Sequence, residues 1–172
     1  MSHRAFVARE RHRGRFDGFL ARDGATDEVL TRLLAPDARL PPDAVSGSPR
    51  VRASSLEDLL AAHLDPIEHE ALLVVHRDGT ATPYVVLPSV LTTADGLLEG
   101  DPTGVALSLV GRDGSTLAPA YVRGWFQGTA GVLGEAVDAG LLAPDEAFTW
   151  LRDAVGRLAG DRHDLVTIPP RR

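Results

Sequence analysis

Two apolar segments on either side of an Asp-Gly turn constrain the fold most strongly. EALLVVH (residues 70–76) and TATPYVVL (residues 80–87) have the length and the β-branched content of buried strands. Between them, Arg77-Asp78-Gly79 puts a glycine where a tight turn needs a positive φ. The sequence therefore predicts a β-hairpin in the middle of the chain, and with it an antiparallel sheet.

Similar patterns predict two further strand pairs. RAFVARE (residues 4–10) and RFDGFLAR (residues 15–22) flank a turn at residues 12–14. VALSLV and TLAPAYVRGW (residues 105–110 and 116–125) flank a second Arg-Asp-Gly turn. The glycine-rich acidic stretch between residues 92 and 104 is predicted to be a connection.

Four segments have the periodicity of amphipathic helices, at residues 26–35, 54–64, 127–140 and 144–160. The first has Thr26 as a predicted N-cap, and the second has Ser54 in a predicted capping box with Glu57. Residues 36–54 hold four prolines and no period, which predicts a long surface loop. Residues 164–172 are predicted to form either an edge strand or a tail.

The order of these elements predicts the fold class. Strand pairs and helices come in blocks instead of alternating, which disfavours a doubly wound dinucleotide fold. At 172 residues the chain has the size of one domain, residues 1–172. We therefore expect a single α+β domain with a mainly antiparallel sheet, built from hairpins, and about four helices packed on it.

The composition excludes several kinds of chemistry. With no cysteine, the chain cannot form disulfides, thiolate zinc sites, iron–sulfur clusters or a cysteine nucleophile. The charged N-terminus does not resemble a signal peptide, and no apolar run approaches the ~20 residues of a membrane span. We therefore expect a cytoplasmic protein without membrane contact, and the sequence predicts no cofactor.

The charge balance indicates which classes of binding partner the chain favours. All 18 basic residues are arginine, against 24 acidic ones, and the net charge of −6 does not favour nucleic-acid binding. One local exception is RERHRGR (residues 9–15), whose alternating arginines would form an anion patch on a continuous strand. Because a turn interrupts this stretch, it is interpreted as a solvated turn. The partner is unknown, and a homodimer is one alternative.

HLDPIEHEALLVVH (residues 63–76) concentrates three of the six histidines. A zinc-protease helix requires His-Glu-x-x-His, and His69-Glu70 lacks the second histidine. The sequence therefore predicts a helix end followed by a buried strand, and no metal site. If the first strand lies beside the third, His3, His63, His69 and Glu70 become candidate catalytic residues. Ser2, exposed by removal of Met1, is a further candidate nucleophile.

YVRGWFQGTAGVLG (residues 121–134) has glycines at every third position from Gly128. The spacing matches neither a dinucleotide-binding fingerprint nor a P-loop, so it favours close packing of a helix on a sheet. Within this stretch, Arg123 and Trp125 are the candidate ligand-binding residues, for an anionic or planar ligand. Their predicted strand alternation requires a polar partner for Arg123, and Glu70 is the expected one.

Three stretches, SHRAFVARER, EDLLAAHLDPIEHEALLVV and YVRGWFQGTAGVLGEAVDAG, follow one another in this order. In them the chain resembles a small family of haloarchaeal proteins of unknown function. The resemblance implies a halophilic cytoplasm, in keeping with the acidic balance and the missing lysine, and it implies no activity. The family's second strand is richer in histidine and tyrosine than FDGFLARDG, so no site is carried over onto residues 16–24.

Two functional hypotheses follow from the sequence. The first is a non-catalytic cytoplasmic accessory or small-ligand-binding domain, because no nucleophile, metal or phosphate motif is assembled in the sequence. The alternative is a small hydrolase or metal-dependent enzyme that uses the histidines and glutamate near residues 63–70.

Overall fold

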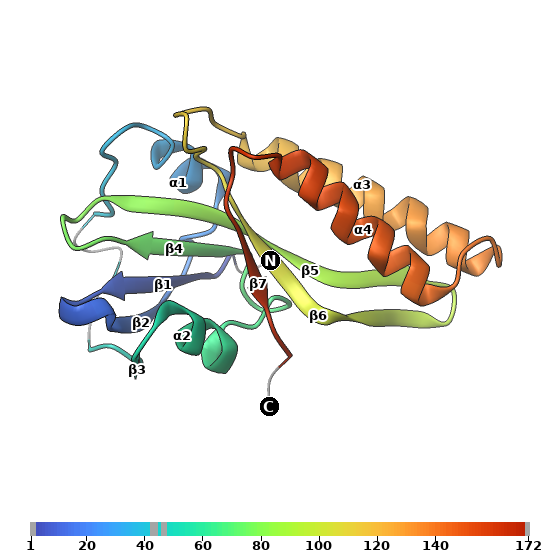
Figure 1. Cartoon of the computed structure of the whole chain (residues 1–172), viewed down its shortest axis with the longest axis horizontal. Coiled ribbons are helices and arrows are strands. Elements are labelled where there is room, and N and C mark those ends of the chain that lie inside the picture. Colours follow the sequence, from blue (N-terminus) through green and yellow to red (C-terminus); the bar gives the residue numbers. More distant parts are fainter. Residues whose placement is uncertain (1–2, 42–44, 46–47, 171–172) are drawn as a thin grey trace.

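The computed structural model describes residues 3–41, 45 and 48–170, and seven strands of this part of the chain form one curled sheet (Figure 1). The strands are β1 (Ala5–Glu10), β2 (Phe16–Ala21), β3 (Val51–Ala53), β4 (Ala71–Val75), β5 (Ala81–Thr93), β6 (Gly96–Ser108) and β7 (Leu165–Ile168). Their order is β3-β2-β1-β4-β5-β6-β7, with β1 and β4 parallel and the other neighbours antiparallel. The α+β class and the mainly antiparallel sheet are confirmed.

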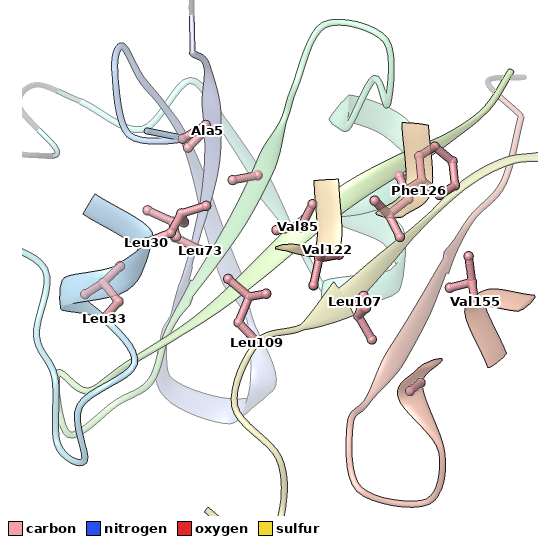
Figure 2. Packing of buried hydrophobic residues seen from close by; sticks show 14 of the residues in the cluster. Ala5, Leu30, Leu33, Leu73, Val85, Leu107, Leu109, Val122, Phe126 and Val155 are labelled. Atoms are coloured by element: carbon pink, nitrogen blue, oxygen red, sulfur yellow. The ribbon is translucent and has the colours of Figure 1, made fainter. Parts of the chain in front are cut away.

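Helices cover both faces of this sheet. They are α1 (Asp27–Arg32), α2 (Leu56–His63), α3 (Pro119–Asp138) and α4 (Pro144–Ala159), with a 3-10 turn η1 (His12–Gly14) between β1 and β2. The larger core cluster lies between the sheet and α1, α3 and α4 (Figure 2), and the smaller one lies under α2. On β4, Leu73 enters the first cluster and Leu72 the second, which explains why that strand is apolar throughout.

The expected connection at residues 92–104 is wrong, because β5 and β6 continue through it. The two strands pair out to Thr93 and Gly96, and α3 and α4 lie along this ribbon (Figure 1). Gly100 packs against the Phe148 ring and Gly104 against the Leu87 carbonyl oxygen, with no room for a Cβ at either glycine. These two glycines therefore serve close packing, not a change of chain direction.

The strand expected at residues 116–125 is also wrong, because α3 begins at Pro119. Proline suits the first position of a helix, where its missing N–H costs no hydrogen bond. Val122 and Phe126, four positions apart, both face the core, as a helix requires. The strand-like alternation of Tyr121, Arg123 and Trp125 was therefore misleading.

Smaller differences concern element boundaries. The N-cap of α2 is Ser55, whose Oγ accepts the Asp58 N–H, and Ser54 instead donates to the Asp58 carboxylate. The stretch expected to be a long loop contains β3, which pairs with β2. In the C-terminal segment, the edge-strand alternative is the one observed, since β7 pairs with β6.

The two Arg-Asp-Gly turns share one arrangement of hydrogen bonds. Asp78 accepts from the Thr80 hydroxyl and N–H, and Asp113 accepts in the same way from Ser115. These bonds, the hydroxyl bond first, hold the pKa of each aspartate below its usual value. The glycine that follows each aspartate has a positive φ, as expected from the sequence.

Candidate functional site

Two segments far apart in sequence meet at the amino ends of β1 and β4. The parallel register pairs Ala5 with Ala71, and the Glu70 N–H donates to the Arg4 carbonyl at 2.9 Å. This pairing brings the His3 Nδ1 to 3.0 Å from the Glu70 Oε2. The structure therefore brings together two of the four candidate catalytic residues.

Arg123 reaches the same place from the second turn of α3. Its guanidinium donates to the Asp27 carboxylate and to the Ala25 carbonyl oxygen. The Glu70 Oε2 lies 4.0 Å from Arg123 Nη2. Arg123 is 19% exposed and Asp27 48%, so the guanidinium is the more buried partner. Glu70, the partner expected from the sequence, is therefore the more distant partner of Arg123, and Asp27 and Ala25 accept its hydrogen bonds.

A cavity of about 260 Å³, here called the α3 cavity, opens beside this cluster. Glu70, Arg123 and Gln127 are the polar residues of its lining, and the apolar ones include Phe126, Ile67 and Pro88. A mostly apolar lining with a few polar groups is typical of small-molecule sites.

Trp125 does not line the α3 cavity. Its side chain is half-buried and packs against the larger core cluster. The neighbouring Phe126, about 100° further around the helix, supplies the aromatic ring of the cavity instead. The expected pair of Arg123 and Trp125 followed from strand alternation, which a helix does not have.

The histidines of residues 63–76 have separate surroundings. His69 is buried, with its Nδ1 3.0 Å from the Asp65 amide nitrogen and its ring edge-on to Phe6. His76 Nε2 lies 2.8 Å from the Thr82 hydroxyl, and His63 is the last residue of α2. The stretch is a helix end followed by a buried strand, which is the interpretation that the sequence favoured.

Neither a metal cluster nor a membrane span is found in the described part of the chain. No group of three or more histidine, aspartate or glutamate side chains there is arranged to hold a metal ion. Among the described helices, none combines the length and apolar composition that crossing a membrane requires. Ser2 lies outside the described residues.

Fold and cavity together define an α+β protein whose sheet is covered on both faces and which has a small cavity at one end of a helix. The chain belongs to DUF6735, a family of unknown function whose model matches residues 23–167. No match was found among curated proteins or among solved structures.

Proposed function

We propose that the protein is a non-catalytic cytoplasmic accessory domain that binds a small organic ligand in the α3 cavity. The observation that carries this proposal is that Glu70 and Arg123, whose Oε2 and Nη2 atoms lie 4.0 Å apart, line a cavity whose other lining residues are mostly apolar. The ion pairs of Arg123 hold its side chain in place before a ligand binds, so binding loses little side-chain entropy there.

The charged residues of the α3 cavity favour a ligand with a hydrogen-bond donor. The guanidinium of Arg123 is already occupied by Asp27 and Ala25, which leaves little of it for an anion. Glu70 is partly exposed and has acceptor capacity beyond its contact with His3. We therefore favour an amine or amide on an apolar body that covers Phe126.

The first prediction tests this ligand class by thermal melts. Small apolar amines and amides are expected to raise the melting temperature by several degrees when present well above their Kd, because binding adds its free energy to the native state. Glu70→Gln should remove most of this rise. Glu68→Gln is the matched control, since Glu68 is exposed and does not line the α3 cavity, and it should keep the rise. A rise produced by organic acids alone would contradict the proposed ligand class.

The contact between His3 and Glu70 favours a second candidate, a small hydrolase. A carboxylate that orients a histidine is a recurrent general-base arrangement. In that case turnover of a model ester or amide should be found in the wild type and lost in both His3→Ala and Glu70→Gln. Turnover that survives both changes would exclude this pair as the catalytic one.

We also propose that the protein is adapted to high salt, as its acidic balance and its resemblance to haloarchaeal proteins suggest. The second prediction is that its melting temperature rises by several degrees between low and molar chloride, because salt screens the repulsion behind the net charge of −6. Differential scanning calorimetry at matched pH measures this. An unchanged melting temperature would remove the argument for salt adaptation.

A further inference from the structure

A second and larger cavity lies at the opposite end of β1 from the α3 cavity. It has a volume of about 600 Å³ and lies beside η1 and the edge strand β3. Its lining includes Arg11, His12, Arg15, Asp17 and Arg52. The lining thus contains three arginines and one carboxylate, in a chain whose net charge is −6. We call this hollow the cationic cavity.

Asp17 holds two of these arginines in place. Its carboxylate is only 8% exposed and lies 2.7 Å from Arg11 Nε and 3.6 Å from Arg52 Nε. The β2–β3 register sets this geometry, because Asp17 pairs directly with Arg52. Both arginines use their Nε toward Asp17, which leaves their terminal amino groups available to a ligand.

Arg15 and His12 add to this unused donor capacity. Within the described ranges, neither side chain forms a hydrogen bond or an ion pair, although both line the cationic cavity. Asp17 is the one carboxylate in a lining with three arginines, so their positive charge is only partly neutralised, and a bound anion would reduce the remaining repulsion. The site is therefore short of negative charge.

We propose that the cationic cavity binds the phosphate group of a small molecule. Several arginine forks around one hollow match the tetrahedral oxygens of a phosphate, to which they can donate bidentate hydrogen bonds. The volume exceeds what one phosphate fills, and the half-buried ring of Phe16 lies beside the arginines for the organic part. The acidic balance of the whole chain disfavours a polymer of phosphates, so a phosphomonoester is the ligand class.

Isothermal titration calorimetry with inorganic phosphate and with a sugar phosphate, each against chloride at equal ionic strength, tests this third prediction. The sugar phosphate should bind more tightly than inorganic phosphate. Arg15→Gln should weaken binding of the sugar phosphate about tenfold, because a charge-assisted pair of hydrogen bonds is lost. Arg52→Gln should weaken it to a similar extent.

The matched control is Arg13→Gln. Arg13 belongs to the same turn and is exposed, but it does not line the cationic cavity, so its loss should change the Kd less than about twofold. Equal weakening by Arg13→Gln and Arg15→Gln would show a diffuse charge effect and overturn the proposal. Absence of binding at millimolar phosphate, or tighter binding of a DNA or RNA oligonucleotide than of the sugar phosphate, would also overturn it. Glu70→Gln should leave phosphate binding unchanged, which separates this site from the α3 cavity.

Discussion

Gly134→Ala is expected to lower the free energy of unfolding by about 3 kcal/mol, although alanine is the better helix former. Gly134 is buried on α3, where the helix crosses the backbone of β5. A Cβ at this position would overlap the Thr92 carbonyl oxygen and lie 3.2 Å from the carbonyl carbon. Because a backbone group cannot rotate away as a side chain does, the whole helix would have to move. Urea denaturation followed by circular dichroism measures the loss.

Two other glycines of α3 provide the control for this change. Gly128 and Gly131 are exposed, and a Cβ at either one would meet no atom within 4 Å. Gly128→Ala and Gly131→Ala should therefore each raise the free energy of unfolding by about 0.5–1 kcal/mol, through helix propensity alone. If Gly134→Ala behaves like these two, the close contact between α3 and β5 does not exist.

The difference between Gly134 and the two exposed glycines shows how much of the packing of α3 the glycine spacing could predict. The three-residue spacing of Gly128, Gly131 and Gly134 suggested packing of a helix on a sheet, and only Gly134 has that role. Spacing alone cannot say which glycine faces the sheet, because that depends on where the helix begins. The start at Pro119 was missed, since Tyr121 to Trp125 alternate as a strand would.

The ribbon of β5 and β6 was missed for a related physical reason. Glycine-rich sequence at residues 92–104 predicts a connection, whereas Gly100 and Gly104 allow the Phe148 ring and the Leu87 backbone to approach the strand. Such contacts come from elements distant in sequence, so local propensity does not contain them. Local signals were sufficient where the element makes its own hydrogen bonds, as at Thr26, whose hydroxyl caps α1 as expected.

The two cavities differ in how many of their residues could be predicted to meet from the sequence alone. Glu70 and Arg123 were expected to meet, and they lie 4.0 Å apart, although the reason is a helix and not the expected strand. Arg11 and Arg15 belong to the alternating run at residues 9–15, but Arg52 comes from a stretch expected to be a loop. Only the pairing of β3 with β2 brings it to Asp17.

Arg123→Ala is expected to lower the free energy of unfolding by about 2 kcal/mol. Its mostly buried guanidinium joins α3 to Asp27 at the start of α1 and to the Ala25 carbonyl oxygen, so two groups lose their partner together. Asp27 is half-exposed, and water will hydrate it in the mutant, which keeps the loss below that of a fully buried pair. Thermal and urea denaturation of the wild type and the mutant measure this change.

Tyr121→Ala provides the control, because Tyr121 lies two residues earlier on α3 with its ring mostly exposed, and its removal should cost no more than about 0.5 kcal/mol. A double-mutant cycle of Arg123→Ala with Asp27→Asn should give a coupling of about 1 kcal/mol or more if their ion pair is the principal contact. An Arg123→Ala protein that melts like the wild type, yet no longer responds to a ligand that protects the wild type, would contradict this structural role of Arg123. Arg123 would then hold the ligand in the α3 cavity, and the attachment of α1 to α3 would rest on their apolar contacts alone.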